Sequence, residues 1–327
     1  MISSKNVALL LLFITCLQTA WAQELPSSSK GALVWIKKMT DAPRQYNFSG
    51  TLIYYADNQI ETSRIVHKID KSGEHERIEV LDGTPRIVFR HNDEMKCYFP
   101  ESKRIYTERR WFRKFFPDYI PHPVDDIDGN YHVTEFRRER VADRESQVLS
   151  LMPRDSLRYG YQFWIDTETG LLLKVAVTYG NEVIEQFAFA QLEINSEIST
   201  EQVNPDVSVI LDQWKITNLT SSLLNEGELK WKITSLPTGF RKLVEMKRNL
   251  TEKPTLVDHV ALTDGLATVS IFIETVDRDE LPVAGLFSSR GAINIYVRTV
   301  GANKITTVGE VPLGTIKLIG DAVIKQQ

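Results

Sequence analysis

The stretch from residue 161 to 196 has the strongest strand pattern in the sequence, YQFWIDTETGLLLKVAVTYGNEVIEQFAFAQLEINS. Gly170 and Gly180 lie in polar turns, which predicts two hairpins that join three consecutive strands. In the third strand, alternate residues from Val183 to Gln191 share one face and those from Ile184 to Leu192 share the other. Both faces carry apolar side chains. Such a sheet must be covered on one face and must enclose a helix, its own strands or an apolar ligand on the other.

The first 22 residues have the features of a secretory signal peptide. Lys5 precedes an apolar run from Val7 to Cys16, and Ala20-Trp21-Ala22 forms a small-x-small cleavage site. The run is shorter than the ~20 apolar residues of a membrane-spanning helix. Thr15 precedes Cys16 where a lipoprotein signal has a small residue, which disfavours that alternative. We therefore expect cleavage before Gln23 and export of the protein.

Charge and cysteine content limit the classes of function. Without residues 1–22, 38 basic and 43 acidic residues remain, a net charge of −5, so no overall preference for polyanions follows. Cys97 is then the only cysteine, which excludes an internal disulfide. We interpret Cys97 as a small apolar side chain of a strand, with a reactive thiol as the alternative. A mature chain of about 305 residues suits two domains.

One helix and a series of strands are predicted in the N-terminal part. Apolar residues first recur at helical spacing: Ala32, Trp35, Ile36 and Met39. Pro43 ends this helix, and from Asn47 six strand-like runs follow, separated by turn residues: FSGTLIYYA, ETSRIVHKI, HERIEVL, RIVFR, MKCYF and RIYTE. Together with residues 161–196 they give about nine to eleven strands, which an antiparallel barrel or a strongly curved sheet would accommodate.

A basic and aromatic segment, RIYTERRWFRKFFPDYIPHP, separates the two sets of strands. Its aromatic side chains could face lipid while its basic side chains face phosphate. Alternatively, the aromatic side chains fill the barrel and the arginines are solvated. The predicted lipid-binding residues are Trp111, Phe112, Phe115, Phe116 and Trp164, and the predicted partner-binding residues are Arg109, Arg110 and Arg113.

Residues 124–135, VDDIDGNYHVTE, match a calcium-binding loop only in part. Four residues fit the loop: Asp126, Asp128, Gly129 and Glu135. Val124 occupies the first ligand position, however, and Pro121 forbids the helix that should precede the loop. We interpret the stretch as an exposed acidic turn.

No catalytic, nucleotide-binding or metal-binding motif occurs in the sequence, and the six histidines are scattered. We therefore predict no catalytic residue, metal or cofactor. A hydrolase assembled from separate strands stays open as an alternative.

The strand pattern is lost after Asn195 and returns later. We expect an N-terminal domain over residues 23–205, a linker over 206–225 and a C-terminal domain over 226–324. Asp264-Gly265 between apolar runs predicts one hairpin, and AINIYVRTV with KITTVGEV predicts another. The stretch from Pro312 to Ile324 is predicted to be a helix that buries Leu313, Ile316, and Ile319 or Gly320. These elements indicate a small α+β domain.

Several segments, in order along nearly the whole mature chain, carry a family resemblance. They are RIVHKIDKSGEHERIEVLDGTPRIVFR, GYQFWIDTETGLLLK, LPTGF, DHVALTDGLATVSIFIE and VGEVPLGTIKLI. The set resembles the RseB/MucB family of periplasmic sigma-E factor regulatory proteins. The resemblance implies a mainly β fold: an unclosed antiparallel barrel similar to the lipoprotein carriers LolA and LolB, with helices in its mouth, and a smaller α+β C-terminal domain.

The resemblance also implies a regulatory function in the periplasm and offers no catalytic residues. A protein of this family binds the periplasmic domain of a single-pass inner-membrane anti-sigma factor, similar to RseA or MucA. It shields that factor from site-one proteolysis and is released when a lipid or lipopolysaccharide fragment signals envelope stress. A lipid or lipoprotein carrier is the alternative function, a homo-oligomer stays open, and export argues against a nucleic-acid partner.

Overall fold

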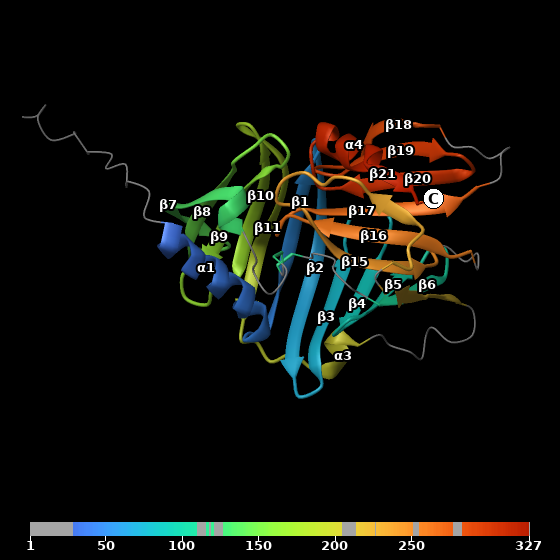
Figure 1. Cartoon of the computed structure of the whole chain (residues 1–327). Helices are drawn as coiled ribbons and strands as arrows, with labels where there is room; N and C mark the ends of the chain where they lie inside the picture. The colour runs from blue at the N-terminus through green and yellow to red at the C-terminus, as the bar shows by residue number, and fades with distance from the viewer. Residues whose placement is uncertain are drawn as a thin grey trace, which may run out of the picture.

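Two large β-sheets dominate the structure, a computed structural model (Figure 1). It describes residues 29–109, 116–117, 119–120, 127–204, 214–225, 227–250, 255–276 and 283–326. The predicted signal peptide, residues 1–22, lies outside these ranges. Within them, no helix is long and apolar enough to cross a membrane.

The first sheet has twelve strands in the order β12-β6-β5-β4-β3-β2-β1-β11-β10-β9-β8-β7. They are β1 (Phe48–Ala56), β2 (Gln59–Asp70), β3 (Gly73–Val80), β4 (Ile87–His91), β5 (Glu94–Phe99), β6 (Arg104–Arg109), β7 (Tyr131–Val141), β8 (Arg144–Pro153), β9 (Gly160–Asp166), β10 (Leu172–Tyr179), β11 (Glu182–Ile194) and β12 (Lys215–Leu219). Only the β12–β6 pair is parallel. In the described part of the sheet, the edge strands β7 and β12 do not pair with each other, so the predicted unclosed antiparallel barrel is confirmed.

The predicted strands correspond to β1–β6 and β9–β11, within one to three residues at most ends. The β7–β8 hairpin was not recognised, for two physical reasons. β7 is an edge strand and carries many charged residues, as exposed edges usually do. Its turn uses Ala142 and Asp143 at positive φ, 49° and 66°, where glycine or asparagine is more usual.

A β-bulge in β11 changes the predicted faces. The pairing with β1 skips Ala190 between Gln191 and Phe189. An extra residue shifts the alternation of side chains by one position. Leu192 therefore joins Phe189 on the face that packs against the core, and the prediction that Leu192 lies on the opposite face was wrong.

Helix α1 (Ser29–Asp41) covers part of the first sheet (Figure 1). Ala32, Ile36 and Met39 are buried among aromatic and branched side chains of β1, β7, β8, β9, β10 and β11. The predicted helix is thereby confirmed, and a short 3-10 helix, η1 (Ala42–Arg44), follows it. We call the sheet face toward α1 the inner face.

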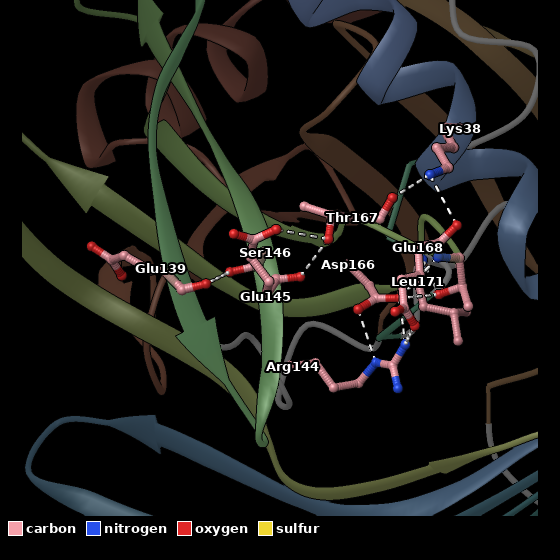
Figure 2. Close-up of polar contacts among 10 residues, drawn as sticks. Lys38, Glu139, Arg144, Glu145, Ser146, Asp166, Thr167, Glu168 and Leu171 are labelled. Carbon is pink, nitrogen blue, oxygen red and sulfur yellow. Dashed lines mark hydrogen bonds and ion pairs between the residues drawn. The ribbon is translucent and has the colours of Figure 1, made fainter. Parts of the chain in front are cut away.

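Polar contacts fix the β9–β10 turn to α1 and β8 (Figure 2). Lys38 of α1 donates a hydrogen bond to the carbonyl oxygen of Thr167, over 2.7 Å. Arg144 of β8 donates two to the Asp166 carboxylate, over 2.8 and 3.0 Å. Gly170 has φ +83°, and a Cβ there would lie 2.6 Å from Cγ of Lys38, so the turn requires glycine.

The second sheet has seven strands in the order β13-β15-β16-β17-β20-β19-β18. They are β13 (Ser221–Leu223), β15 (Arg241–Arg248), β16 (Val257–Thr263), β17 (Thr268–Thr275), β18 (Gly285–Ser288), β19 (Asn294–Val300) and β20 (Asn303–Gly309). Both predicted hairpins are present, as β16–β17 and β19–β20. The other short helices are α2 (Ile127–Asn130) and α3 (Thr200–Val203).

The C-terminal helix is shorter than predicted. Helix α4 (Leu313–Asp321) buries Ile316, Ile319 and Gly320, but Leu313 is exposed. The chain then forms β21 (Val323–Lys325), which pairs with β14 (Trp231–Ile233). The predicted end at Ile324 was wrong because these residues complete a strand pair.

The stretch predicted to be a linker, residues 206–225, contributes a strand to each sheet. β12 pairs with β6 of the first sheet, and β13 pairs with β15 of the second. Only Thr220 separates β12 from β13. Residues 205–213 lie outside the described ranges. The predicted domain boundaries stay a prediction.

A buried charge cluster lies on the inner face beside η1. Nε2 of His67 lies 2.8 Å from the carbonyl oxygen of Pro43, and its Nδ1 lies 3.4 Å from Glu76. Arg90 donates hydrogen bonds to Glu76 and to Glu74, over 3.4 and 3.0 Å. Burial alone raises the pKa of Glu76, but the attraction of Arg90 and the contact with His67 outweigh it and lower that pKa to about 2.

Replacing Glu76 by glutamine should lower the free energy of unfolding at pH 7 by about 3 kcal/mol, because the buried Arg90 loses its buried carboxylate partner and keeps only the partly exposed Glu74. A carboxyl with a lowered pKa stabilises the fold above its ordinary value of 4.5, and this stabilisation is lost as the pH falls toward about 2. The variant should therefore lose less stability than the unaltered protein between pH 5 and 2, measured by urea unfolding. Equal pH profiles would contradict the prediction, and Glu193→Gln, at an exposed site, is the control.

Candidate functional site

The C-terminal sheet lies in front of β1–β5, and its strands cross theirs (Figure 1). Contacts between the two sheets include those made by three regions of the described second sheet. They are the tip of the β16–β17 hairpin, the loop of residues 289–293 between β18 and β19, and the end of β15. These regions determine which residues form the space between the sheets.

The hairpin tip is held in a buried polar site of the first sheet. The Asp264 carboxylate accepts hydrogen bonds from Tyr131 and Arg158, over 3.0 and 2.9 Å, and its carbonyl oxygen accepts one from Asn130, over 2.8 Å. The side chains of Arg158 and Asp264 are fully buried. Burial, with the Asp264 charge, raises the pKa of Tyr131 well above its usual value. We call Asn130, Tyr131, Arg158 and Asp264 the hairpin anchor.

The hairpin anchor corrects the interpretation of residues 124–135. Asp128 and Gly129 are exposed, but Asn130 and Tyr131 are buried against the second sheet. The prediction of an exposed acidic turn was therefore wrong for these two residues, and also for Ile127 and Val133, which are buried in the core. Residues 124–126 lie outside the described ranges.

The loop of residues 289–293 contacts three carboxylates of the first sheet. Arg290 donates to Glu61 over 3.3 Å, the Gly291 amide to Asp57 over 2.9 Å, and the Ala292 amide to Glu185 over 3.1 Å. Gly291 has φ +66°, and a Cβ there would lie 2.3 Å from Oε2 of Glu185. Only glycine allows this close approach.

The third contact is an ion pair between β15 and β6. Arg248 donates a hydrogen bond to Glu108 over 2.7 Å, and both side chains are buried. The second sheet is thus fixed to the first at both ends of the β15–β17 region and at the loop before β19. The second sheet covers part of the inner face, and we call it the lid.

A cavity of about 620 Å³ lies between the inner face and this lid. Alternate residues of neighbouring strands form its wall, because successive side chains of a strand point to opposite faces. The wall residues of the first sheet are Leu52, Tyr54, Glu61, Ser63, Ile78, Val80, Val88, Met95, Cys97, Phe99, Glu185 and Phe187. Arg290, Ile293 and Glu310 close the cavity from the second sheet. Such a cavity, mostly apolar with a few polar groups, is typical of a small-molecule site.

Phe116 is the one predicted lipid-binding residue that the described structure brings to this cavity. It is 5% exposed, and its ring lies nearly parallel to that of Phe187, with centroids 6.0 Å apart. Phe116 is thus both part of the core and part of the cavity wall. Trp111, Phe112 and Phe115 lie outside the described residues.

Trp164 lies on the outer face of the sheet and does not line the cavity. It packs against Val148 and Ala176, and its ring nitrogen donates a hydrogen bond to Glu139 over 2.6 Å. The ammonium group of Lys174 lies 4.2 Å from the ring centroid. Phe163 and Ile165, the neighbours of Trp164 in β9, point inward. Because side chains alternate along a strand, Trp164 points outward.

Of the predicted partner-binding residues, only Arg109 lies within the described ranges. It ends β6, has an exposed side chain and donates two hydrogen bonds to Asp93, over 3.0 and 2.8 Å. Arg110 and Arg113 lie outside the described residues. Whether these arginines contact a partner stays a prediction.

The cavity wall includes one thiol, three carboxylates and two arginines. Cys97, which forms no disulfide among the described residues, places a partly buried thiol in the wall. Across the described part of the chain, no group of three or more His, Cys, Asp or Glu residues could hold a metal ion.

The contacts between the sheets were missed by sequence reasoning, because Asp264 was recognised only as a turn residue.

Comparison with known families connects this architecture to one group of proteins. The family model of the MucB/RseB N-terminal domain matches residues 31–207, and that of the MucB/RseB C-terminal domain matches residues 225–324. The chain belongs to the MucB/RseB family. The resemblance predicted from the sequence segments is therefore confirmed.

Relatives and solved structures agree with this assignment. The "Sigma factor AlgU regulatory protein MucB" of Pseudomonas aeruginosa is 27% identical over 296 residues, 87% of this chain and 88% of the relative. The "Sigma-E factor regulatory protein RseB" of Haemophilus influenzae is 25% identical over 303 residues, 92% and 91% of the two chains. The fold matches the "Crystal structure of MucB in complex with MucA(peri)" with a TM-score of 0.68 and 24% identity, over 90% of this chain and 99% of the other.

Replacing Asp264 by alanine should destabilise the protein by about 3 to 5 kcal/mol, because Arg158 would stay buried without its fully buried partner. The loss should appear in urea unfolding, together with faster hydrogen exchange in the β16–β17 hairpin and in Tyr131. Glu193→Ala, at an exposed acid of β11, is the control. A change below about 0.5 kcal/mol, the usual effect of a surface substitution, would show that the hairpin anchor does not hold the sheets together.

Proposed function

We propose that this protein is a negative regulator of the sigma-E envelope stress response that binds the periplasmic domain of a membrane anti-sigma factor. The observation that carries the proposal is the match of the MucB/RseB family models to both halves of the chain. The fold similarity to MucB, solved in complex with MucA(peri), supports it. The signal-like residues 1–22 support a periplasmic location. In this proposal the protein is not an enzyme.

Shielding the partner from a site-one protease requires a long contact surface. A protease-sensitive segment is accessible when free, so ordering it costs roughly 2 to 5 kcal/mol, which many contacts must offset. In this proposal, a groove of about 540 Å³ at the junction of the two sheets is part of that surface. Exposed apolar side chains of the first sheet and of helix α4 line it: Tyr179, Val183 and Leu313.

Release of the partner by lipid follows from linkage between two sites. A lipid that binds the partner-free form more tightly weakens partner binding by the same factor by which the partner weakens lipid binding. The cavity under the lid is the lipid site in this proposal, and Phe116 is part of its wall.

The same cavity favours a second candidate function, a carrier of lipid or lipoprotein. A pull-down from solubilised envelope extract distinguishes the two. Recovery of a single-pass inner-membrane protein supports the regulator, whereas recovery of an outer-membrane lipoprotein supports the carrier.

Binding of the anti-sigma domain should require both sheets, because the groove is lined from both. A fragment of residues 23–219, which keeps β12 on the first sheet, should bind the anti-sigma domain at least tenfold more weakly than the whole chain. Calorimetry on both proteins measures the difference. Equal affinity would exclude the C-terminal sheet from the partner site.

Reversing the charges of Arg109 and Arg110 tests the basic segment. We expect Arg109→Glu with Arg110→Glu to slow association with an acidic anti-sigma segment, to reduce its salt dependence and to speed site-one proteolysis in a purified mixture, because exposed charges act mainly through the association rate. Arg138→Glu is a matched control, since Arg138 is a similarly exposed arginine paired with a carboxylate. Unchanged association and proteolysis in the double variant would remove this segment from the partner site.

A further inference from the structure

Two arginines share one carboxylate at the polar end of the cavity. Arg290 donates a hydrogen bond to Oε2 of Glu61 over 3.3 Å, and Arg86 lies 3.6 Å from Oε1 of the same residue. A guanidinium group has five N–H donors, so one carboxylate leaves most donors of the two groups unused. Nε of Arg290 is buried and has no hydrogen-bond partner among the described residues. The group of Arg86, Glu61 and Arg290, which we call the arginine pair site, has two positive charges and one negative charge, and Glu185 and Glu310 line other parts of the same cavity.

The arginine pair site continues directly into the apolar wall. The guanidinium of Arg290 lies 4.6 Å from the ring centroid of Tyr54. The Tyr54 ring stacks on Phe187 with centroids 4.4 Å apart, and Phe187 stacks on Phe116. A ligand chain beside this series of rings would have one end at the two arginines and the other among apolar side chains.

We propose that Arg86 and Arg290 bind the anionic head group of an amphiphile, a phosphate or a carboxylate, whose alkyl chain lies in the cavity. The proposal rests on the proposed function, because it assigns a ligand chemistry to the same cavity. Charge-assisted bonds from arginine to such oxyanions are short, strong and often bidentate. The head group takes the place of the Glu61 carboxylate beside Arg290. Glu185, another carboxylate of the cavity wall, accepts hydrogen bonds from Tyr54 and Ala292 at its Oε2.

Head-group binding would act on the junction of the two sheets. Arg86 precedes β4 of the first sheet, whereas Arg290 belongs to the loop that holds the lid. The next two residues of that loop donate their amides to Asp57 and Glu185. Displacing Glu61 from Arg290 therefore changes one of the three contacts of this loop, and any partner bound across the junction is linked to the ligand.

The test compares hexadecyl phosphate, 1-hexadecanol and inorganic phosphate as probes, each titrated into the full mature chain below its aggregation concentration. Hexadecyl phosphate should bind at least tenfold more tightly than hexadecanol, and inorganic phosphate should not bind measurably at the same concentrations. Arg86→Gln and Arg290→Gln should each weaken hexadecyl phosphate about tenfold and leave hexadecanol unchanged. Arg290→Lys should retain part of the affinity, and Arg138→Gln is the control for loss of an exposed arginine.

Equal affinities for the phosphate and the alcohol would overturn the proposal. So would equal losses for both probes in the arginine variants, because they would indicate a structural role. Tight binding of inorganic phosphate that Arg290→Gln abolishes would assign the site to a free anion and also refute the amphiphile. Binding of the anti-sigma domain, measured without lipid, separates the two ideas: if it persists while the head-group effect is absent, only this inference fails.

Discussion

The buried ion pair between Arg158 and Asp264 determines how the two sheets are placed. Two charges removed from water are tolerated only when each finds its partner and further hydrogen bonds. Tyr131 of the first sheet donates a hydrogen bond to the Asp264 carboxylate, Asn130 of α2 donates one to the Asp264 carbonyl oxygen, and the hairpin provides two more from its own amides to the carboxylate. The two charges of this pair come from different sheets. The hairpin tip is thereby held at one place on the first sheet.

The cavity is a consequence of this placement combined with the alternation of strand side chains. The inner faces of β9 and β10 pack closely with α1, through residues such as Phe163 and Val175. The inner faces of β3, β4 and β5 also turn apolar side chains inward, including Val80, Val88 and Met95, and these line the cavity under the lid. Because the strands of the second sheet cross those of the first, the two twisted sheets touch in separate regions rather than along their whole surfaces. The apolar inner face is thus divided between a packed core and a hollow.

The sequence predicted most strands of both sheets, because each strand and its turn are local features. Gly170 and Gly265 have positive φ in their turns, and a glycine between two strand-like runs is a turn signal that the sequence itself shows. The bulge at Ala190 could not be foreseen, since it depends on pairing with a strand far away in the chain. The face of the sheet that Trp164 occupies also depends on the register of β9, and the residue type alone does not reveal it. The contacts of the hairpin anchor, of residues 289–293 and of Arg248 join residues 106 to 234 positions apart, and no local pattern marks them.

The loop before β19 places the ligand cavity and the groove next to each other. Arg290 lines the cavity, and the adjacent Gly291 lines the groove. The first sheet shows the same division, because Tyr54 faces the cavity while its neighbour Tyr55 faces the groove. Coupling between a ligand and a partner requires only that each has different contacts with one shared element. Here the shared element is a single loop held by three carboxylates, so the proposed release of a partner by a lipid needs no path through the core.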